Sequence, residues 1–177
     1  LTGSGGPFRT RELDTFANVS VSEALAHPNW EMGRKISIDS ATMMNKGFEL
    51  IEAFWLFKLD AKKIDIIIHP QSIIHSMVEF IDSSIKAQIG VPDMKVPIQY
   101  ALTYQRHVRA PWESLNFSKV NKLTFEEPDY KRFPCLLLAK KSLKQLGSSP
   151  TALNLSNDYA VERFLKGEIP FNKIHKI

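Results

Sequence analysis

The pattern of apolar and polar residues along the chain predicts helices separated by short strands. The longest helical signal begins near Asp39 and ends near Lys58. On a wheel of about 100° per residue, most of this segment places apolar side chains on one face and polar ones on the other. A shorter helix is expected over residues 20–26, because Ser20 and Glu23 have the spacing of a capping box. Further helices are predicted over residues 97–105, 134–147 and 156–167.

Short apolar runs predict strands. Residues 72–81 and 84–90 are joined by the turn Asp-Ser-Ser, so they are expected to pair as a hairpin. The chain opens with leucine and threonine before the glycine-rich sequence "GSGGPF" over residues 3–8, which is typical of a strand that ends in a loop. Because the beginning of that strand is not in the sequence, we expect the chain to be a fragment. Two further strands are predicted over residues 35–38 and 64–69.

The character of the sequence changes near residue 110. Strands and helices alternate before this point, whereas residues 110–133 have poor periodicity and recurring prolines, and only helices are predicted beyond them. The sequence therefore predicts an α/β catalytic domain over residues 1–109, an α+β fold with a mixed sheet and a hairpin. A linker over 110–133 and the start of an all-α bundle over 134–177 would follow.

Composition and charge exclude several classes of protein. With 44% hydrophobic and 24% charged residues in a chain of 177, the sequence has the composition of one globular domain, or of one domain and part of another. The net charge of +4 comes without an arginine-rich run or zinc-finger spacing, so it is weak evidence for nucleic-acid binding and suits an anionic small substrate equally well. No apolar run is long enough to span a membrane. The single cysteine cannot form an intrachain disulfide, which favours a reducing compartment.

The long predicted helix has an unusual set of polar residues near its start. Asn45 lies four positions and Lys46 three positions before Glu49, so the three side chains can point at one small volume. A helix start offers unpaired N–H groups and partial positive charge, to which Ser40 and Thr42 add hydroxyls and Lys46 a full charge, an assembly that suits a phosphate. Glu49 is a hard oxygen ligand for Mg²⁺ or Mn²⁺. The alternative is a capped amphipathic helix with a solvated lysine–glutamate pair.

Other candidate residues each have a structural alternative. Ser4 in the glycine-rich loop can contact an anion or belong to a plain tight turn. His27 can donate a hydrogen bond to a ligand. Trp30 can be a lid that excludes water or a side chain docked on the core. Met94 and Asp93 lie on a proline-bounded loop that contacts a ligand or merely turns.

Four more residues are interpreted as structural. Gly47 costs about 1 kcal/mol relative to alanine inside a helix, so we expect another part of the molecule to pack closely against it. His69 and His75 match no zinc signature. Cys135 follows a proline at a helix start beside an apolar run, and is expected to be buried rather than nucleophilic.

Four segments together resemble the 1-deoxy-D-xylulose 5-phosphate reductoisomerase family. They are "GSGGPFR", "HPNWEMGRKISIDSATMMNKGFELIEA", "HPQSIIHSMVEF" and "VPDMKVPI", and they occur in the family's order through essentially the whole chain. In that family an NADPH-binding domain precedes the catalytic α/β domain, a linker and a helical bundle. The NADPH-binding glycine motif and an Asp-Ser-Glu segment that supplies two further metal ligands would lie before Leu1. Asp158, where the family usually has glutamate, is one of few departures.

The resemblance implies an enzyme that rearranges the carbon skeleton of 1-deoxy-D-xylulose 5-phosphate and reduces the resulting aldehyde with NADPH. The product would be 2-C-methyl-D-erythritol 4-phosphate, in non-mevalonate isoprenoid biosynthesis. NADPH and Mg²⁺ or Mn²⁺ are implied as cofactors, the metal acting as a Lewis acid. A homodimer is implied too, in the cytoplasm, or in a plastid if the source is a plant or alga. The fragment alone is expected to be inactive.

The resemblance also implies roles for individual residues. Glu49 would be the third metal carboxylate, and Glu49, Lys46 and His27 are the catalytic candidates. Gly33 would lie beside NADPH and Met94 on the nicotinamide side. Substrate contacts, largely at the phosphate and with Trp30 as the lid, are implied for Ser4, His27, Trp30, Ser40, Asn45, Lys46 and Glu49.

Two other functions stay open at this point. One is a degenerate module that binds a sugar phosphate or dimerises without catalysis, which an upstream sequence without the Asp-Ser-Glu segment or the NADPH-binding glycine motif would favour. Nucleic-acid binding rests only on the basic isoelectric point, and it predicts a steep salt dependence of DNA affinity.

Overall fold

The computed structural model describes residues 1–28, 32–104 and 106–177. The strands are β1 (Thr2–Gly3), β2 (Ile67–Ile68), β3 (Ile74–Glu79) and β4 (Ile85–Ile89). The α-helices are α1 (Val21–Leu25), α2 (Arg34–Thr42), α3 (Met44–Phe57), α4 (Lys95–Leu102), α5 (Pro134–Gln145) and α6 (Ser149–Leu165). Short 3-10 helices are η1 (Leu13–Asn18), η2 (Ala61–Lys63), η3 (Phe117–Lys119) and η4 (Phe171–Lys176).

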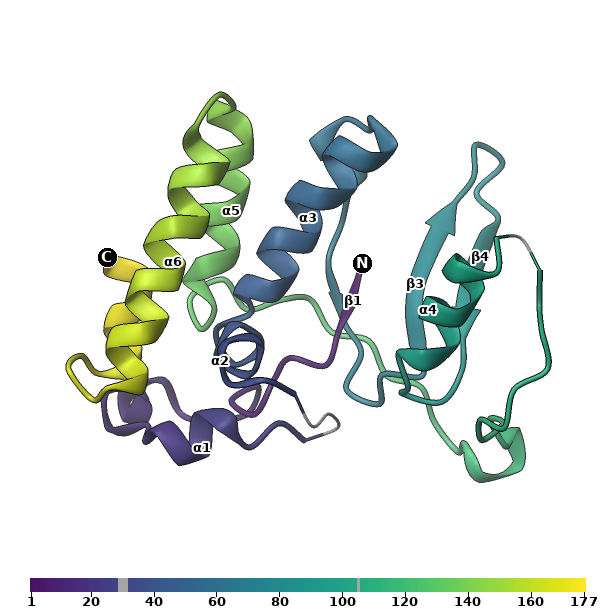
Figure 1. The fold of residues 1–177 in the computed structure, drawn as a ribbon, viewed down its shortest axis with the longest axis horizontal. Coiled ribbons are helices and arrows are strands. Elements are labelled where there is room, and N and C mark those ends of the chain that lie inside the picture. Colours follow the sequence, from purple (N-terminus) through teal and green to yellow (C-terminus); the bar gives the residue numbers. More distant parts are fainter. Residues whose placement is uncertain (29–31, 105) are drawn as a thin grey trace.

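The elements form two groups that meet at β1 and β2 (Figure 1). Helices α2, α3, α5 and α6 pack together on one side, and β3, β4 and α4 lie on the other. Strand β1 pairs in parallel with β2, with Thr2 opposite Ile67. The Thr2 hydroxyl donates to the carbonyl oxygen of Ile74 at 2.7 Å, which ties β1 to β3. The architecture is therefore a mixed fold of helices and small sheets.

Residues 35–38, predicted as a strand, belong to helix α2. In a strand, Ile36 and Ile38 would share one face. In the helix they lie about 200° apart, and Ile38 is fully buried while Ile36 is 41% exposed. The strand prediction is wrong because two alternating isoleucines are too short a pattern to distinguish a strand from a helix.

The single long helix predicted around this region is two helices. Met43 adopts a left-handed backbone conformation, with φ of 61°, between α2 and α3. Thr42 stabilises the break: its hydroxyl donates to the carbonyl oxygen of Ile38 at 3.1 Å and accepts from the backbone N–H of Met44 at 3.3 Å. The amphipathic pattern continues across the break, so periodicity alone does not reveal it.

Gly47 marks a close contact between α3 and α5. A Cβ atom at this position would lie 2.8 Å from the Cβ of Ala139, well inside contact distance. The expectation of a close packing partner is confirmed, and the partner is a helix rather than a ligand. On the same apolar face Met43, Leu50 and Ile51 are buried, and Phe54 is partly buried.

Two hydrophobic cores join early and late parts of the chain. One core packs Phe8 and Ile38 against Phe164 of α6 and Phe171 of η4. The other surrounds α3 and includes Leu50, Ile68 of β2, and Phe133, Leu136 and Ala139 at and within α5. Helices α5 and α6 therefore hold α2 and α3 in place.

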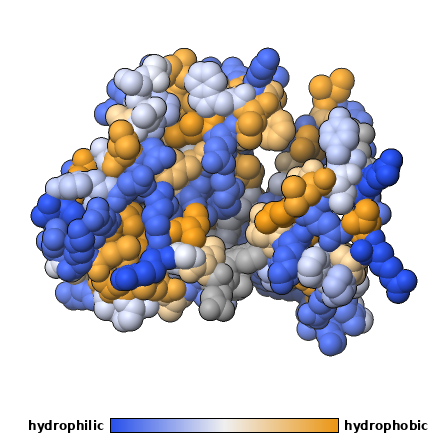
Figure 2. Space-filling model, in the orientation of Figure 1, coloured by the Kyte–Doolittle hydropathy of each residue, from blue (hydrophilic) through white to orange (hydrophobic). Residues whose placement is uncertain are grey.

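The predicted hairpin is confirmed, because β3 pairs antiparallel with β4. Every residue of β4 is exposed, and large apolar side chains of the hairpin, such as Ile81 and Ile85, face solvent. Figure 2 shows a hollow on this face between the hairpin group and the larger helical group. The strand predicted over residues 64–69 is shorter than expected, since only Ile67–Ile68 pair as β2.

The late helices follow their sequence signals. Helix α5 begins at Pro134 as predicted. Helix α6 begins at Ser149, earlier than predicted, and is followed by Gly167 with a positive φ of 74°. None of the helices within the described residues is long and apolar enough to cross a membrane.

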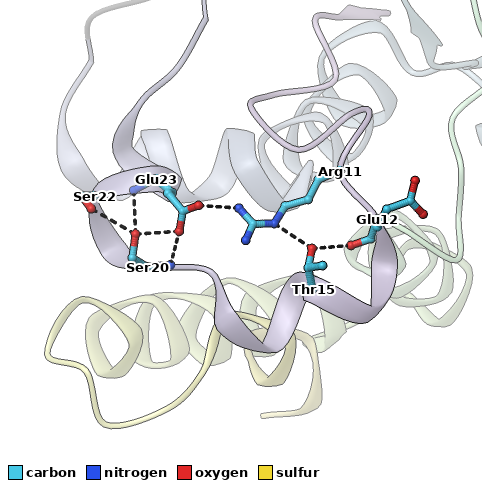
Figure 3. A network of polar contacts seen from close by, with 6 residues as sticks. All are labelled: Arg11, Glu12, Thr15, Ser20, Ser22 and Glu23. Atoms are coloured by element: carbon cyan, nitrogen blue, oxygen red, sulfur yellow. Dashed lines mark hydrogen bonds and ion pairs between the residues drawn. The ribbon is translucent and has the colours of Figure 1, made fainter.

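Helix α1 begins with the predicted capping box (Figure 3). The Glu23 backbone N–H donates to the Ser20 hydroxyl at 3.2 Å, and the Ser20 N–H donates to the Glu23 carboxylate at 2.8 Å. Arg11 also donates to this carboxylate, at 2.6 Å. The backbone hydrogen bond from Ser20, together with those from Arg11 and the Ser20 hydroxyl, lowers the pKa of Glu23 to about 2. These contacts tie the segment after the glycine-rich loop to α1.

Candidate functional site

The left-handed turn at Met43 creates a new helix start at α3. Asn45 and Lys46 lie in the first turn of this helix, where unpaired N–H groups and the helix dipole favour an anion. The predicted helix start near residue 39 is wrong, so Ser40 lies in the last turn of α2 instead. Thr42, the other hydroxyl proposed for this site, is engaged with the backbone at the break. The candidate anion site therefore lies at the start of α3, and not at the helix start predicted near residue 39.

Lys46 and Glu49 form an ion pair at this helix start. The Lys46 Nζ lies 2.5 Å from Glu49 Oε1, and their side chains are 13% and 41% exposed. The alternative of a solvated lysine–glutamate pair therefore describes Glu49 but not Lys46, whose side chain is largely enclosed. Asn45 adds a buried side-chain oxygen that has no hydrogen-bond partner among the described residues. A polar ligand at this place would satisfy it.

The glycine-rich turn after β1 lies against both helices. A Cβ on Gly3 would come within 3.2 Å of Lys46 side-chain carbons, and one on Gly6 would lie 2.5 Å from the carbonyl oxygen of Ser40. Gly6 also has a positive φ of 63°, so this position demands glycine twice over. The turn brings Ser4 to the junction of α2 and α3. The sequence "GSGGPF" predicts a loop with unusual backbone angles, which Gly6 confirms, but it does not predict the close approach of Gly3 and Gly6 to α3 and α2.

His27 joins the cluster from the loop after α1. Its Nε2 lies 3.2 Å from the Ser4 hydroxyl oxygen, which also accepts from the Gly6 N–H at 3.2 Å. Burial lowers the pKa of His27, so the imidazole is neutral at physiological pH. A neutral imidazole can donate one hydrogen bond and accept another. The structure therefore joins Ser4 to His27 and packs the same turn against the Ser40 carbonyl and the Lys46 side chain, which in turn pairs with Glu49.

The two residues predicted to contact NADPH, Gly33 and Met94, are exposed N-caps of two other helices. Gly33 is the exposed N-cap of α2, and its carbonyl oxygen accepts from the Ser37 hydroxyl at 3.0 Å. Met94 is the N-cap of α4 and 51% exposed, in the hairpin group of elements (Figure 1). Trp30, the predicted lid, lies outside the described residues. The NADPH roles of Gly33 and Met94 stay predictions.

A divalent metal would find only part of its ligand set among the described residues. Within residues 1–28, 32–104 and 106–177, no group of three or more His, Cys, Asp or Glu side chains could hold a metal ion. Mg²⁺ and Mn²⁺ prefer several oxygen ligands. The half-exposed carboxylate of Glu49 is of the right chemistry for one of them, with the buried Asn45 oxygen nearby in sequence. The donor set fits a shared metal site.

The histidines and the cysteine outside the cluster have structural contacts, as expected. His69 Nδ1 lies 2.9 Å from the carbonyl oxygen of Thr124, and His75 Nε2 lies 3.1 Å from that of Val91. Burial raises the pKa of the Cys135 thiol to about 12, so it does not ionise near neutral pH. We therefore interpret His69, His75 and Cys135 as structural residues.

Comparison with known families accounts for most of the chain. A family model described as "DXP reductoisomerase C-terminal domain" matches residues 89–177, and one described as "1-deoxy-D-xylulose 5-phosphate reductoisomerase C-terminal domain" matches residues 1–57. The chain belongs to the 1-deoxy-D-xylulose 5-phosphate reductoisomerase family. This confirms the resemblance seen in the four sequence segments.

Curated reductoisomerases match over the whole chain. The enzyme of Chloroherpeton thalassium is 58% identical over 177 residues, which are 100% of this chain and 46% of that protein. The enzyme of Nitrosomonas eutropha is 54% identical over 177 residues, 100% of this chain and 43% of that protein. The chain thus spans less than half the length of these reductoisomerases.

Solved reductoisomerase structures have the same fold over this region. The Zymomonas mobilis enzyme, in complex with NADPH, superposes with a TM-score of 0.92 at 52% identity and covers 99% of this chain and 45% of its own. A second reductoisomerase, in complex with NADPH, fosmidomycin and magnesium, reaches 0.97 at 46% identity, covering 99% of this chain and 43% of its own. The arrangement of α2, α3, α5 and α6 is therefore a family property.

Proposed function

We propose that this chain forms the substrate-phosphate site, and supplies one metal ligand, of a 1-deoxy-D-xylulose 5-phosphate reductoisomerase. The whole enzyme would use NADPH to make 2-C-methyl-D-erythritol 4-phosphate in non-mevalonate isoprenoid biosynthesis. Family membership supports the reaction. The observation that supports the site is the meeting of Ser4, Ser40 and Lys46, from three separate segments, around the glycine-rich turn.

The start of α3 would bind the substrate's phosphate. The helix dipole and first-turn N–H groups favour an anion, and the largely enclosed Lys46 adds a full positive charge. Ser4 and Ser40 would add hydroxyl donors from either side, and Asn45 an amide. Lys46, which now pairs with Glu49, would turn to the phosphate when substrate binds. The neutral His27 would donate a hydrogen bond near the same end of the substrate.

Glu49 would be one carboxylate ligand of Mg²⁺ or Mn²⁺, and it would touch the substrate. When bound, the metal would polarise the substrate's carbonyl and hydroxyl oxygens. Its other carboxylate ligands would come from a segment that this chain does not contain. In this scheme the ion pair between Lys46 and Glu49 would break when substrate and metal bind, because Lys46 would then pair with the phosphate and Glu49 with the metal.

The cofactor and lid contacts are proposed on the resemblance alone. Gly33 would lie beside NADPH, Met94 on the nicotinamide side, and Trp30 over the substrate backbone. Gly33 is consistent with a close approach in one respect: no atom of residues 1–28, 32–104 or 106–177 lies within 4 Å of a Cβ built there.

The wider organisation of the protein is part of the same proposal. Residues 1–109 would belong to the catalytic domain, 110–133 to a linker and 134–177 to the start of an all-α bundle. The exposed apolar hairpin suits a homodimer contact, since large exposed apolar surfaces commonly mark interfaces. The enzyme would work in the cytoplasm, or in a plastid if the source is a plant or alga.

The test follows NADPH absorbance after addition of 1-deoxy-D-xylulose 5-phosphate and Mn²⁺ to the complete gene product that contains this chain. We expect turnover from the complete product and none from residues 1–177 alone. Lys46→Gln should lower kcat/KM by roughly ten- to a hundredfold, mainly through KM, because it removes a charge-assisted hydrogen bond. Lys62→Gln, at an exposed lysine, is the control and should leave kcat/KM unchanged. Absence of turnover in folded, metal-loaded protein would instead favour a degenerate binding module.

A further inference from the structure

A buried carboxylate lies directly beside the substrate-site serine. Asp39 precedes Ser40 in the last turn of α2 and is only 1% exposed. Burying a charge is costly unless it is paired and hydrogen-bonded. Both carboxylate oxygens of Asp39 have such partners, and they come from two helices.

Asn157 of α6 holds one oxygen of this carboxylate. Its amide Nδ2 donates to Asp39 Oδ1 at 2.8 Å, across 118 positions of sequence, and Asn157 is itself only 3% exposed. The amide nitrogen must face Asp39, because the amide oxygen would be repelled by the carboxylate. This contact fixes the rotation of α2 relative to α6 at the turn that carries Ser40.

Lys35 holds the other oxygen. Its Nζ lies 2.9 Å from Asp39 Oδ2 and 3.0 Å from Asp158 Oδ1, so the lysine bridges α2 and α6. The network therefore has a charge-balanced centre in Lys35 and Asp39, with α6 engaged at two neighbouring positions, Asn157 and Asp158.

Stability alone is a weak reason for such a network. Lys35 is 46% exposed, which weakens its ion pair, and a buried carboxylate is often no more stabilising than an apolar side chain of similar size. In some proteins such buried polar contacts instead specify one arrangement of their helices. The arrangement specified here is the one that presents Ser40. The carbonyl oxygen of Ser40 lies so close to Gly6 that a Cβ there would be 2.5 Å away, so a small rotation of α2 would disturb the glycine-rich turn and Ser4 as well.

We propose that Asn157 is a positioning residue of the substrate-phosphate site, acting through Asp39. No residue of α6 is among the proposed substrate contacts. Through Asp39, however, α6 would fix the position of Ser40 and, through the glycine-rich turn, that of Ser4. The inference rests on the proposed function for the identity of the ligand. It predicts that a change on α6 alters substrate binding.

The central variants exchange the two side chains of the pair. Asn157→Asp places a second carboxylate opposite Asp39, and the repulsion should rotate α2 away from its place. In the double variant Asp39→Asn/Asn157→Asp, an amide again faces a carboxylate, with donor and acceptor reversed. Asn157→Ala removes the hydrogen bond without adding charge, and serves if the single charged variant does not fold.

The control is Val161→Ala on the same helix. Val161 is 1% exposed in the hydrophobic core, so its truncation should destabilise α6 without touching Asp39. Thermal unfolding gives the Tm of every variant, so that substrate binding can be compared between variants that are equally destabilised. The readouts are KM for 1-deoxy-D-xylulose 5-phosphate, KM for NADPH and the calorimetric Kd for the same sugar phosphate, with the complete gene product.

We expect Asn157→Asp and Asn157→Ala to raise KM and Kd for the sugar phosphate roughly tenfold or more, as displaced binding groups do, with KM for NADPH unchanged. The double variant should recover most of this loss, and Val161→Ala should show none of it. An unchanged Kd in the Asn157 variants, or an equal rise in Val161→Ala, would overturn the inference. Wild-type protein that binds the sugar phosphate without turnover would refute only the proposed reaction, because the Kd comparison would still decide on Asn157. Wild-type protein that neither binds nor reacts would overturn both.

Discussion

At the scale of single residues, the site combines features that the sequence reveals with others that it hides. The spacing of Lys46 and Glu49 is local, so one helical turn is enough to predict that their side chains meet, as the ion pair confirms. The contact between Asp39 and Asn157 spans 118 positions, and no local pattern announces it. Gly47 lies between these cases: its cost inside a helix predicted a close neighbour, but only the fold shows that the neighbour is Ala139.

Substitution of Gly47 tests that packing. Gly47→Ala should gain about 1 kcal/mol in helix propensity and lose about 1–3 kcal/mol through overpacking against Ala139, so a net loss is expected. Ala139→Gly in the same protein should recover stability, because the pair then exchanges sizes. Urea unfolding of the wild type, both single variants and the double variant measures this, and strictly additive effects would contradict the close contact.

At the scale of elements, the sequence predicted the helices and the hairpin better than their boundaries. The capping box of α1, the hairpin of β3 and β4, and the proline start of α5 depend on neighbouring residues, and all three are present. The break at Met43 was missed, since its left-handed conformation is imposed by packing and by the Thr42 hydroxyl. The strand predicted over residues 35–38 failed because burial of Ile38 against α6 decides in favour of helix.

The capping box of α1 predicts a specific dependence of stability on pH. The pKa of Glu23 falls from 4.5 to about 2 in the folded state, so the unfolded chain binds its proton more tightly. The stabilisation is complete above the unfolded pKa and is lost as the pH falls through the window between these values. Between about pH 5 and about pH 3, Glu23→Gln should therefore lose less stability than the wild type, because glutamine does not titrate.

Denaturant midpoints at the two pH values measure this effect. Glu12→Gln is the matched control, since Glu12 contributes its backbone carbonyl rather than its carboxylate to the same network (Figure 3). It should follow the wild type. Identical pH dependence in wild type and Glu23→Gln would show that the capping carboxylate is not linked to folding.

At the scale of the whole molecule, the late helices support the early ones. Helix α5 packs on α3 at Gly47, and α6 contacts α2 at Asp39, so both helices of the proposed phosphate site are supported by residues near the other end of the chain (Figure 1). The sequence indicated an α/β part followed by helices, but it gave no sign that they share two cores.

The central claim is that the start of α3 binds a sugar phosphate on one side and a metal on the other, with Glu49 on the metal side. The most direct test compares wild type and Glu49→Gln in the complete gene product, by following NADPH absorbance with 1-deoxy-D-xylulose 5-phosphate over a series of Mn²⁺ concentrations. Glutamine keeps the size of the side chain but loses its charge, so turnover should fall at least roughly a hundredfold and require more Mn²⁺. Turnover that survives in Glu49→Gln with the same Mn²⁺ dependence would remove Glu49 from the metal site and contradict the account.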